Sequence, residues 1–255
     1  MFWLLKFFIK TIIRLQIIAV SVAAGMAIAY GLQLREQSRS WGVASGDAAN
    51  EMAGDDLVAD PDHVDTRSLS IDAAAGDVWP WIAQLGYGRG GWYSYAPIDR
   101  PWSPGGGSPG SSADSILPEY QDLDVGDIVP THRSGGFEAK VVEADEALVL
   151  YLDDTMVREQ LQQSVAEHAE GDEETSEAVS RMENMPAFRL SWAFILEPEG
   201  GGSTRLIERF RVHMDLTDQQ RMGLPFMGLG VFALMRSQML GIKQRVETSG
   251  ESLAA

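Results

Sequence analysis

The stretch from Leu15 to Leu34 constrains this chain most, because it holds twenty consecutive residues without a charge. Twenty helical residues span the roughly 30 Å hydrocarbon core of a bilayer at about 1.5 Å per residue. A helix of a soluble core is rarely apolar on every side over such a length. Trp3 and the basic residues before the stretch suit one interfacial flank, and Tyr30 suits the other. We therefore expect residues 1–34 to form a membrane anchor helix.

The fate and direction of this segment leave alternatives open. The triplet Ala27-Ile28-Ala29 has the small-x-small form that signal peptidase accepts, so a cleaved signal peptide is the rival to a retained anchor. Three basic residues and the terminal amine precede the span, and two arginines follow it. This bias favours an inside amino terminus. We expect a single-pass cell-membrane protein with an extracytoplasmic body.

The rest of the chain is strongly acidic. Residues 1–40 carry five basic residues and one acidic residue, a net charge of +4. Since the whole chain has a net charge of −17, residues 41–255 carry −21. A body of this charge lacks the basic footprint that nucleic acid requires. The absence of cysteine excludes disulfides and thiolate metal sites. The four histidines are scattered without metal-ligand spacing, so we expect no metal and no cofactor.

The body reads as one α+β domain over residues 66–248, preceded by a linker over 35–65. Residues 66–71 alternate as a strand, Asp72 is placed to cap a helix over 73–85, and a glycine-rich loop follows. Five further strands and a closing helix to about Glu247 complete the pattern. The expected strands lie at 125–130, 137–143, 148–152, 188–196 and 206–214, the last two forming a hairpin at Gly200–Ser203. An antiparallel sheet wrapped around a long closing helix would leave a cavity suited to an apolar ligand.

An acidic insertion interrupts the strands at about residues 153–185. Residues 153–183 carry ten acids against two arginines, among helix-forming Gln, Ala and Glu. We interpret this stretch as a solvated helical excursion or a partly disordered insertion. It lacks a calcium-loop pattern.

The most distinctive sequence segment runs from Val78 to Tyr95 and ends in the aromatic loop GYGRGGWYSY. With the segments at 113–127, 192–198, 204–207 and 239–243, it resembles a bacterial branch of the SRPBCC, or START-like, superfamily of polyketide cyclase/dehydratase-like proteins. The resemblance covers about residues 57–247 and implies a helix-grip fold. It implies no shared catalytic set, because the superfamily includes lipid carriers and ring-forming enzymes. Ala96-Pro97 stands where an acidic and an aromatic residue are usual in that branch.

Several residues could line the expected cavity. The glycine-rich loop offers Arg89 and an aromatic set, and packing over the sheet edge is the other interpretation of that loop. Methionines of the closing helix fit a pliable wall, although core filling explains them equally well. The residues we predict to contact a ligand are Arg89, Trp92, Tyr93, Tyr95, Trp192, Glu208, Met227 and Met235.

Glu208 is the one residue that we consider for catalysis. It shares the parity of Leu206, Phe210 and Val212, so it should lie on the apolar face, where burial raises a carboxyl pKa. A slipped register or a strand-end ion pair would remove that role. The neighbours Arg209 and Arg211 fall on the opposite parity and are expected in solvent.

These features predict a membrane-tethered START-like domain that binds a hydrophobic small molecule or lipid in an internal cavity. The first alternative is a polyketide cyclase/dehydratase-type enzyme, in which Glu208 and a loop tyrosine would act as acid and base. The second alternative is a non-catalytic envelope interaction protein, whose acidic insertion would bind a protein partner.

Overall fold

The computed structural model describes residues 37–44, 47–94, 112–167, 186–217 and 224–254, with Ile18, Ser21, Val22 and Gly25. The chain divides into two units, residues 1–38 and residues 39–255. Within the described residues, no helix is both long and apolar enough to cross a bilayer. The span predicted at 15–34 lies almost entirely outside them.

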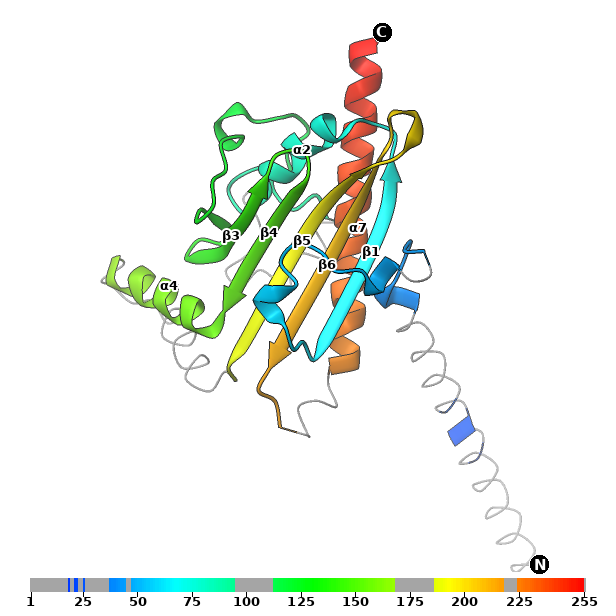
Figure 1. Ribbon diagram of the computed structural model, residues 1–255. Coiled ribbons are helices and arrows are strands. Elements are labelled where there is room, and N and C mark those ends of the chain that lie inside the picture. The colour runs from blue at the N-terminus through cyan, green and yellow to red at the C-terminus, as the bar shows by residue number, and fades with distance from the viewer. Residues whose placement is uncertain are drawn as a thin grey trace, which may run out of the picture. The chain divides into compact units, whose positions relative to one another are not determined.

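The second unit is built on a six-stranded antiparallel sheet, which confirms the predicted α+β class (Figure 1). The strands lie in the order β1-β6-β5-β4-β3-β2, so β2 to β6 form a meander and β1 adds beside β6. Their bounds are β1 His63–Ile71, β2 Ile128–His132, β3 Gly135–Glu143, β4 Ala147–Asp153, β5 Phe188–Pro198 and β6 Thr204–Met214. All six were predicted to within a few residues, because alternating apolar residues and glycine or acidic turns mark each one.

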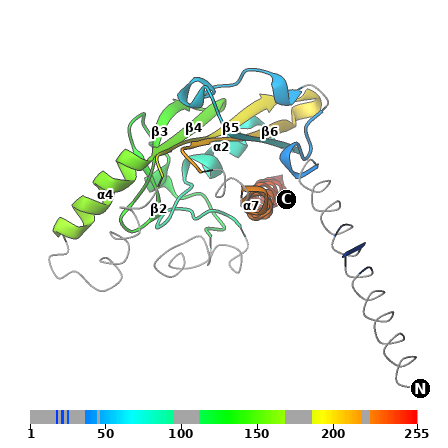
Figure 2. The ribbon, with the colours of Figure 1, turned by 90° about the horizontal axis from the view of Figure 1, so that it is seen from below.

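Helices α2 (Ala75–Ala83) and α7 (Leu224–Ala254) lie against the same face of the sheet (Figure 2). Both were predicted, but the predicted cap of α2 is wrong. Its N-cap residue is Ala74, which makes no side-chain cap, while the Asp72 carboxylate accepts a hydrogen bond from the Ser203 hydroxyl at 3.0 Å. Asp72 therefore ties the β5–β6 hairpin to the end of β1.

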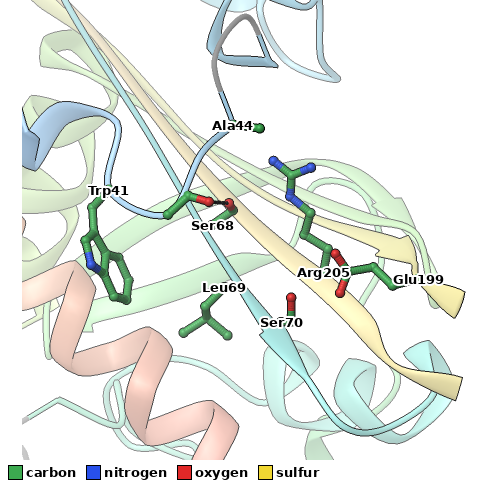
Figure 3. Close-up of a pocket in the computed structure, with 8 residues that line it drawn as sticks. Trp41, Ala44, Ser68, Leu69, Ser70, Glu199 and Arg205 are labelled. Carbon is green, nitrogen blue, oxygen red and sulfur yellow. Dashed lines mark hydrogen bonds between the residues drawn. The ribbon is translucent and has the colours of Figure 1, made fainter. Parts of the chain in front are cut away.

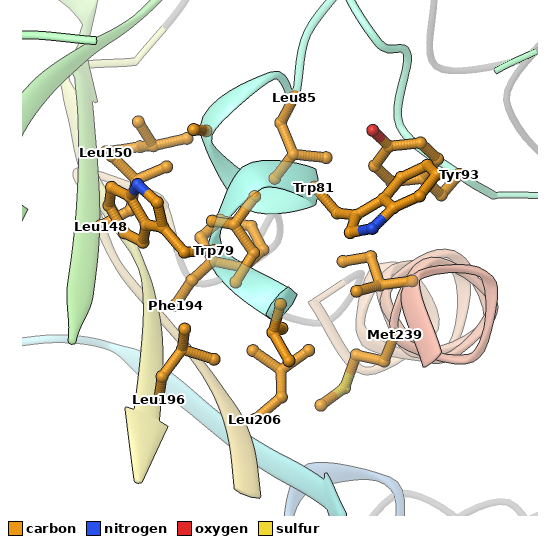
Figure 4. Packing of buried hydrophobic residues seen from close by; sticks show 14 of the residues in the cluster. Trp79, Trp81, Leu85, Tyr93, Leu148, Leu150, Phe194, Leu196, Leu206 and Met239 are labelled. Atoms are coloured by element: carbon orange, nitrogen blue, oxygen red, sulfur yellow. The ribbon is translucent and has the colours of Figure 1, made fainter. Parts of the chain in front are cut away.

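The core lies between the sheet and these two helices (Figure 4). The buried face of α2 carries Val78, Trp81 and Ile82, as its helical spacing predicts. The carboxy-terminal part of α7 contributes Met239, Ile242 and other buried residues at intervals of three or four. In this part of the molecule, side chains fill the space that was predicted to hold a cavity.

The opposite face of the sheet is covered by residues 47–62, which we call the outer strap (Figure 2). The strap contains the short 3₁₀ helices η1 (Asp47–Ala49) and η2 (Asp56–Val58), and the Val58 side chain is fully buried. Much of the segment predicted as a linker at 35–65 is therefore folded onto the sheet, and β1 itself begins at His63.

The outer strap also corrects the expectation that Arg209 and Arg211 are solvated. Arg209 is only 2% exposed and donates hydrogen bonds to the Asp55 carboxylate at 2.7 Å and to the Thr66 hydroxyl at 3.0 Å. Arg211 donates to the Val58 carbonyl at 3.1 Å. Alternation placed both arginines on the outer face correctly, but it could not show that the strap covers that face.

Two smaller elements frame the loops. Helix α4 (Asp154–Glu167) opens the predicted acidic insertion, and the rest of the insertion lies outside the described residues. The 3₁₀ turn η3 (Pro118–Tyr120) lies in the connection to β2, and η4 (Gly200–Gly202) forms the predicted turn between β5 and β6. Gly201 and Gly202 have φ near +80° to +90°, which explains the glycines of this turn.

Candidate functional site

A row of charged side chains lies on the α7 side of β1. His63, Asp65 and Arg67 occupy alternate positions of this strand, so all three point to the face that carries Leu69 and Ile71 at the other end. The Arg67 side chain is 0% exposed and donates to the Asp65 carboxylate at 2.7 Å. The other Asp65 oxygen lies 3.0 Å from His63 Nε2. The three side chains thus form one continuous polar row under α7.

Two side chains of helix α7 contact the Arg67 guanidinium. Arg67 donates to the sulfur of Met235, and its guanidinium lies 5.4 Å from the ring centroid of Phe232. Burial alone would raise the pKa of Asp65, but His63 at 3.0 Å and the charge of Arg67 outweigh burial and lower that pKa. Asp65 is therefore a carboxylate whose charge is matched inside the protein by Arg67, while the partly exposed Arg39 lies 3.7 Å from its other oxygen.

Glu208 lies directly opposite Arg67 in the β1–β6 register and points to the same face. Its side chain is 0% exposed, and neither carboxyl oxygen has a hydrogen-bond partner in the described protein. Burial raises the pKa of Glu208 to about 8, although the charge of Arg67 and the nearby Trp192 indole act in the opposite direction. That indole N–H stops short of a hydrogen bond, since it too has no partner. Glu208 is consequently a neutral acid at pH 7.

Two further buried polar side chains, one on β5 and one on α7, also lack hydrogen-bond partners in the described protein. Trp192 lies on β5, diagonal to Glu208 across the β5–β6 pair, and its indole nitrogen is buried. Gln238 is 1% exposed and follows Met235 by one helical turn on α7, and both of its amide atoms lack a partner. Buried polar atoms in native proteins are nearly always paired with protein, water or ligand. We call Glu208, Trp192 and Gln238 the unpaired cluster.

An aromatic wall surrounds the Trp192 end of this cluster. The Trp192 ring stacks on Trp92 at 5.4 Å, with an interplanar angle of 9°. Phe137 and Phe210 present their edges to the same ring at 5.9 Å and 6.4 Å, and Phe194 lies at 5.0 Å. The site therefore combines large apolar surfaces with a few unpaired polar atoms, which is the composition of small-molecule sites.

The predicted loop residues divide between this wall and simple packing. Trp92 reaches the wall through Trp192, whereas Arg89 donates to the carbonyls of Ala83 at 2.8 Å and Tyr120 at 3.2 Å. Arg89 thus fastens its own loop to the end of α2.

Tyr93 is also fastened locally, since its hydroxyl accepts a hydrogen bond from the Gln84 amide at 2.7 Å. Burial raises the pKa of Tyr93 to about 12. Of the other predicted residues, Met235 lies beside Arg67, while Tyr95 and the side chain of Met227 lie outside the described part of the structure.

Sequence reasoning selected Glu208, Trp192 and Met235 but missed the row on β1. Arg67 shares parity with Leu69 and Ile71, just as Glu208 shares parity with Leu206. Alternation along β1 and β6 together would have placed Arg67 and Glu208 on the apolar face of the sheet. Gln238 carried a similar signal, because it lies three residues after Met235 and four before Ile242, both buried on α7.

A separate pocket of about 470 Å³ opens at the edge of β1 (Figure 3). Its lining includes Trp41, Ser68 and Ser70 on one side and Glu199 and Arg205 of the β5–β6 hairpin on the other. The serines point to the outer face, so this pocket is distinct from the unpaired cluster. In the described ranges, no group of three or more acidic or histidine side chains is arranged to hold a metal ion.

Comparisons with known proteins assign no family. No protein-family model matches the sequence, and no curated protein matches it significantly. A conserved protein from Geobacillus kaustophilus is similar in structure, with 10% identity, 71% of this chain and 93% of that chain covered, and a TM-score of 0.34.

Two further bacterial structures show a similarly low identity and TM-score. A protein from Mesorhizobium loti has 14% identity, covers 73% of this chain and 98% of its own, and gives a TM-score of 0.33. A protein from Arthrobacter aurescens has 12% identity, covers 77% of this chain and 92% of its own, and gives a TM-score of 0.34. These likenesses are too weak to assign a function.

Proposed function

We propose that residues 39–255 form a START-like helix-grip domain that binds a hydrophobic small molecule or lipid between the sheet and α7. The observation that carries the proposal is the unpaired cluster. Five buried polar atoms of Glu208, Trp192 and Gln238 lack partners in the described protein. Leaving such an atom unpaired costs about 1–3 kcal/mol, so a protein retains several of them where a ligand completes the set.

The surroundings of the cluster suit the apolar part of such a ligand. Trp92, Trp192 and Phe210 offer flat apolar surfaces, and Met235 is an unbranched side chain that adapts to different shapes. The amino-terminal half of α7 covers the same end of the sheet as His63, because Gly228 lies beside the His63 ring. We place the ligand beneath this half of the helix.

Native mass spectrometry of the full chain, extracted from membranes in detergent, tests the proposal. We expect a bound species that survives extraction and adds a discrete lipid-like mass. Trp92→Ala should reduce the bound fraction, because Trp92 stacks on Trp192. Tyr151→Ala is the matched control, since Tyr151 is similarly half-buried but contacts Asp153 and Lys140 on β4 and β3. A wild-type spectrum with the bare chain alone, under conditions that keep it folded, would contradict the proposal.

We further propose that residues 15–34 tether this domain to the cell membrane, with the body on the extracytoplasmic side. Alkaline extraction should leave the protein in the membrane fraction, and protease added outside intact cells should digest the body. The mass of the mature chain separates the two alternatives for this segment. A chain that begins after Ala29 would show a cleaved signal peptide.

A cyclase/dehydratase-type enzyme is the second candidate, because Glu208 is a buried acid whose pKa of about 8 suits proton transfer. The loop tyrosine expected as its partner is not Tyr93, whose hydroxyl is engaged by Gln84. If Glu208 removes a carbon-bound proton and returns one from solvent, a bound ligand should gain deuterium in heavy water. Wild-type protein that leaves the ligand mass unchanged after prolonged incubation would discard this mechanism.

A further inference from the structure

The charges around the unpaired cluster are balanced. Arg67 and Asp65 form an ion pair at 2.7 Å, and Glu208 opposite them is uncharged at neutral pH because burial raises its pKa. Arg39 lies 3.7 Å from the other Asp65 oxygen, but its side chain is partly exposed, so the two fully buried charges, Arg67 and Asp65, sum to zero. The buried interior therefore offers no surplus charge to a ligand, and a charged head would enter an environment of low dielectric without a counter-ion of its own.

The unpaired atoms are mostly hydrogen-bond donors. A neutral Glu208 carries one O–H donor, the Trp192 indole carries one N–H donor, and the Gln238 amide adds two N–H donors. The acceptors are the other Glu208 oxygen and the Gln238 carbonyl. Glu208 and Trp192 lie diagonally on neighbouring strands and face the same way, so one ligand atom can receive both donors.

We propose that the ligand carries an uncharged carbonyl (an ester, amide or ketone) at the polar end of a hydrophobic body, and that Glu208 and Trp192 donate hydrogen bonds to its oxygen. This inference rests on the proposed function and specifies the head group of that ligand. A carbonyl oxygen has two lone pairs and no proton, which matches two convergent donors. The ring of Trp192 and its aromatic neighbours then receive the hydrocarbon adjoining the carbonyl.

The two charged alternatives fit less well. A carboxylate head would lie beside Glu208, while the guanidinium of Arg67 is already matched by Asp65. An ammonium head would need Glu208 ionised and would lie within reach of the Arg67 charge. Each alternative therefore loses the charge balance that the neutral carbonyl preserves.

Three probes of equal chain length separate these heads: methyl hexadecanoate, hexadecanoate and hexadecylamine. Each is titrated into the full-length protein in detergent at neutral pH, and native mass spectrometry measures the bound fraction. We expect the ester to bind about tenfold more tightly than either charged probe, since one retained hydrogen bond in a buried site has this effect on affinity.

Substitutions at Glu208 test the donor directly. Glu208→Gln keeps a neutral donor, and we expect ester affinity within about threefold of wild type. Glu208→Leu removes it, and we expect a loss of about tenfold or more. Glu119→Gln is the matched control, because Glu119 is exposed. With a ¹³C-labelled ester, the carbonyl stretch should shift to lower frequency on binding to wild type and to Glu208→Gln, but not to Glu208→Leu.

The outcomes separate this inference from the proposed function. Tighter binding of hexadecanoate or hexadecylamine, or an unchanged ester affinity in Glu208→Leu, would overturn the inference and leave lipid binding intact. If none of the probes binds, tandem mass spectrometry identifies any co-purified ligand. A ligand without a neutral carbonyl then overturns the inference, and the absence of any ligand overturns the proposed function itself.

Discussion

Replacing Glu208 by glutamine should stabilise the protein, and the gain should depend on pH. The pKa of Glu208 rises from 4.5 to about 8 on folding, because burial disfavours the carboxylate. Between these two pH values the folded state holds a proton that the unfolded state releases, so stability falls as pH rises. The penalty is absent below the unfolded pKa and complete above the folded pKa.

The size of the effect follows from the same two values. Each pH unit in this window costs the folded state about 1.4 kcal/mol. At pH 7, which is about 2.5 units above the unfolded pKa of 4.5, the penalty reaches about 3 kcal/mol, and above the folded value of about 8 it levels at about 5 kcal/mol. Glutamine has nearly the same shape and never ionises. The variant should therefore match wild type near pH 4.5 and exceed it by about 3 kcal/mol at pH 7.

Differential scanning calorimetry of the full chain in detergent at pH 5, 7 and 9 measures this difference. For a body of this length, about 3 kcal/mol corresponds to a rise in Tm of about 6–12 °C. Glu119→Gln, at an exposed acid, should follow wild type at every pH. A Tm difference between Glu208→Gln and wild type that stays constant at pH 5, 7 and 9 would refute the reasoning, since it would show that Glu208 titrates as an ordinary surface acid.

Two further predictions concern the packing on each side of the sheet. Asp55→Ala removes the carboxylate that Arg209 contacts at 2.7 Å, and thermal unfolding should show a loss of about 3 kcal/mol, whereas Asp56→Asn, at an exposed acid, should change stability by less than about 0.5 kcal/mol. Gly241→Ala would drive a methyl group into the Tyr93 backbone carbonyl and should cost about 1–3 kcal/mol in denaturant titrations. Gly250→Ala, in open space on the same helix, should instead gain up to about 1 kcal/mol; equal effects of the two glycine substitutions would contradict the close approach at position 241.

The fold was largely predictable because its strands obey a local rule. Alternation along β6 placed Glu208 on the apolar face and Arg209 on the other, and the structure confirms both placements. The chemistry of each face was not local. Glu208 is opposite Arg67, which lies 141 residues earlier in the chain, and only the sheet register brings the two together. A strand read alone shows which way a side chain points and not what it meets.

The outer strap, on the opposite face of the sheet, was also not predictable from local sequence. Residues 47–62 are rich in small and acidic residues, so the pattern indicated a linker. The strap is held by Arg209 and Arg211, which bind the Asp55 carboxylate and also donate to backbone carbonyls that no side-chain pattern reveals. The polar strap would be compatible with solvent. It lies on the sheet because its carbonyls and the Asp55 carboxylate accept hydrogen bonds from Arg209 and Arg211 of β6.

The strap also determines how this domain bears mechanical load. The chain enters the domain through Arg39, which donates to the Val64 carbonyl, and Trp41, whose carbonyl accepts from the Ser68 amide. It then passes through the Arg209 and Arg211 contacts before it becomes β1. A pull on the amino terminus therefore reaches β1 first through the edge contacts, because Val64 and Ser68 belong to that strand, and it acts on the arginine contacts of the strap only after these edge contacts break. The polar row under α7 shares this load, since Arg39 Nε lies 3.7 Å from the Asp65 carboxylate.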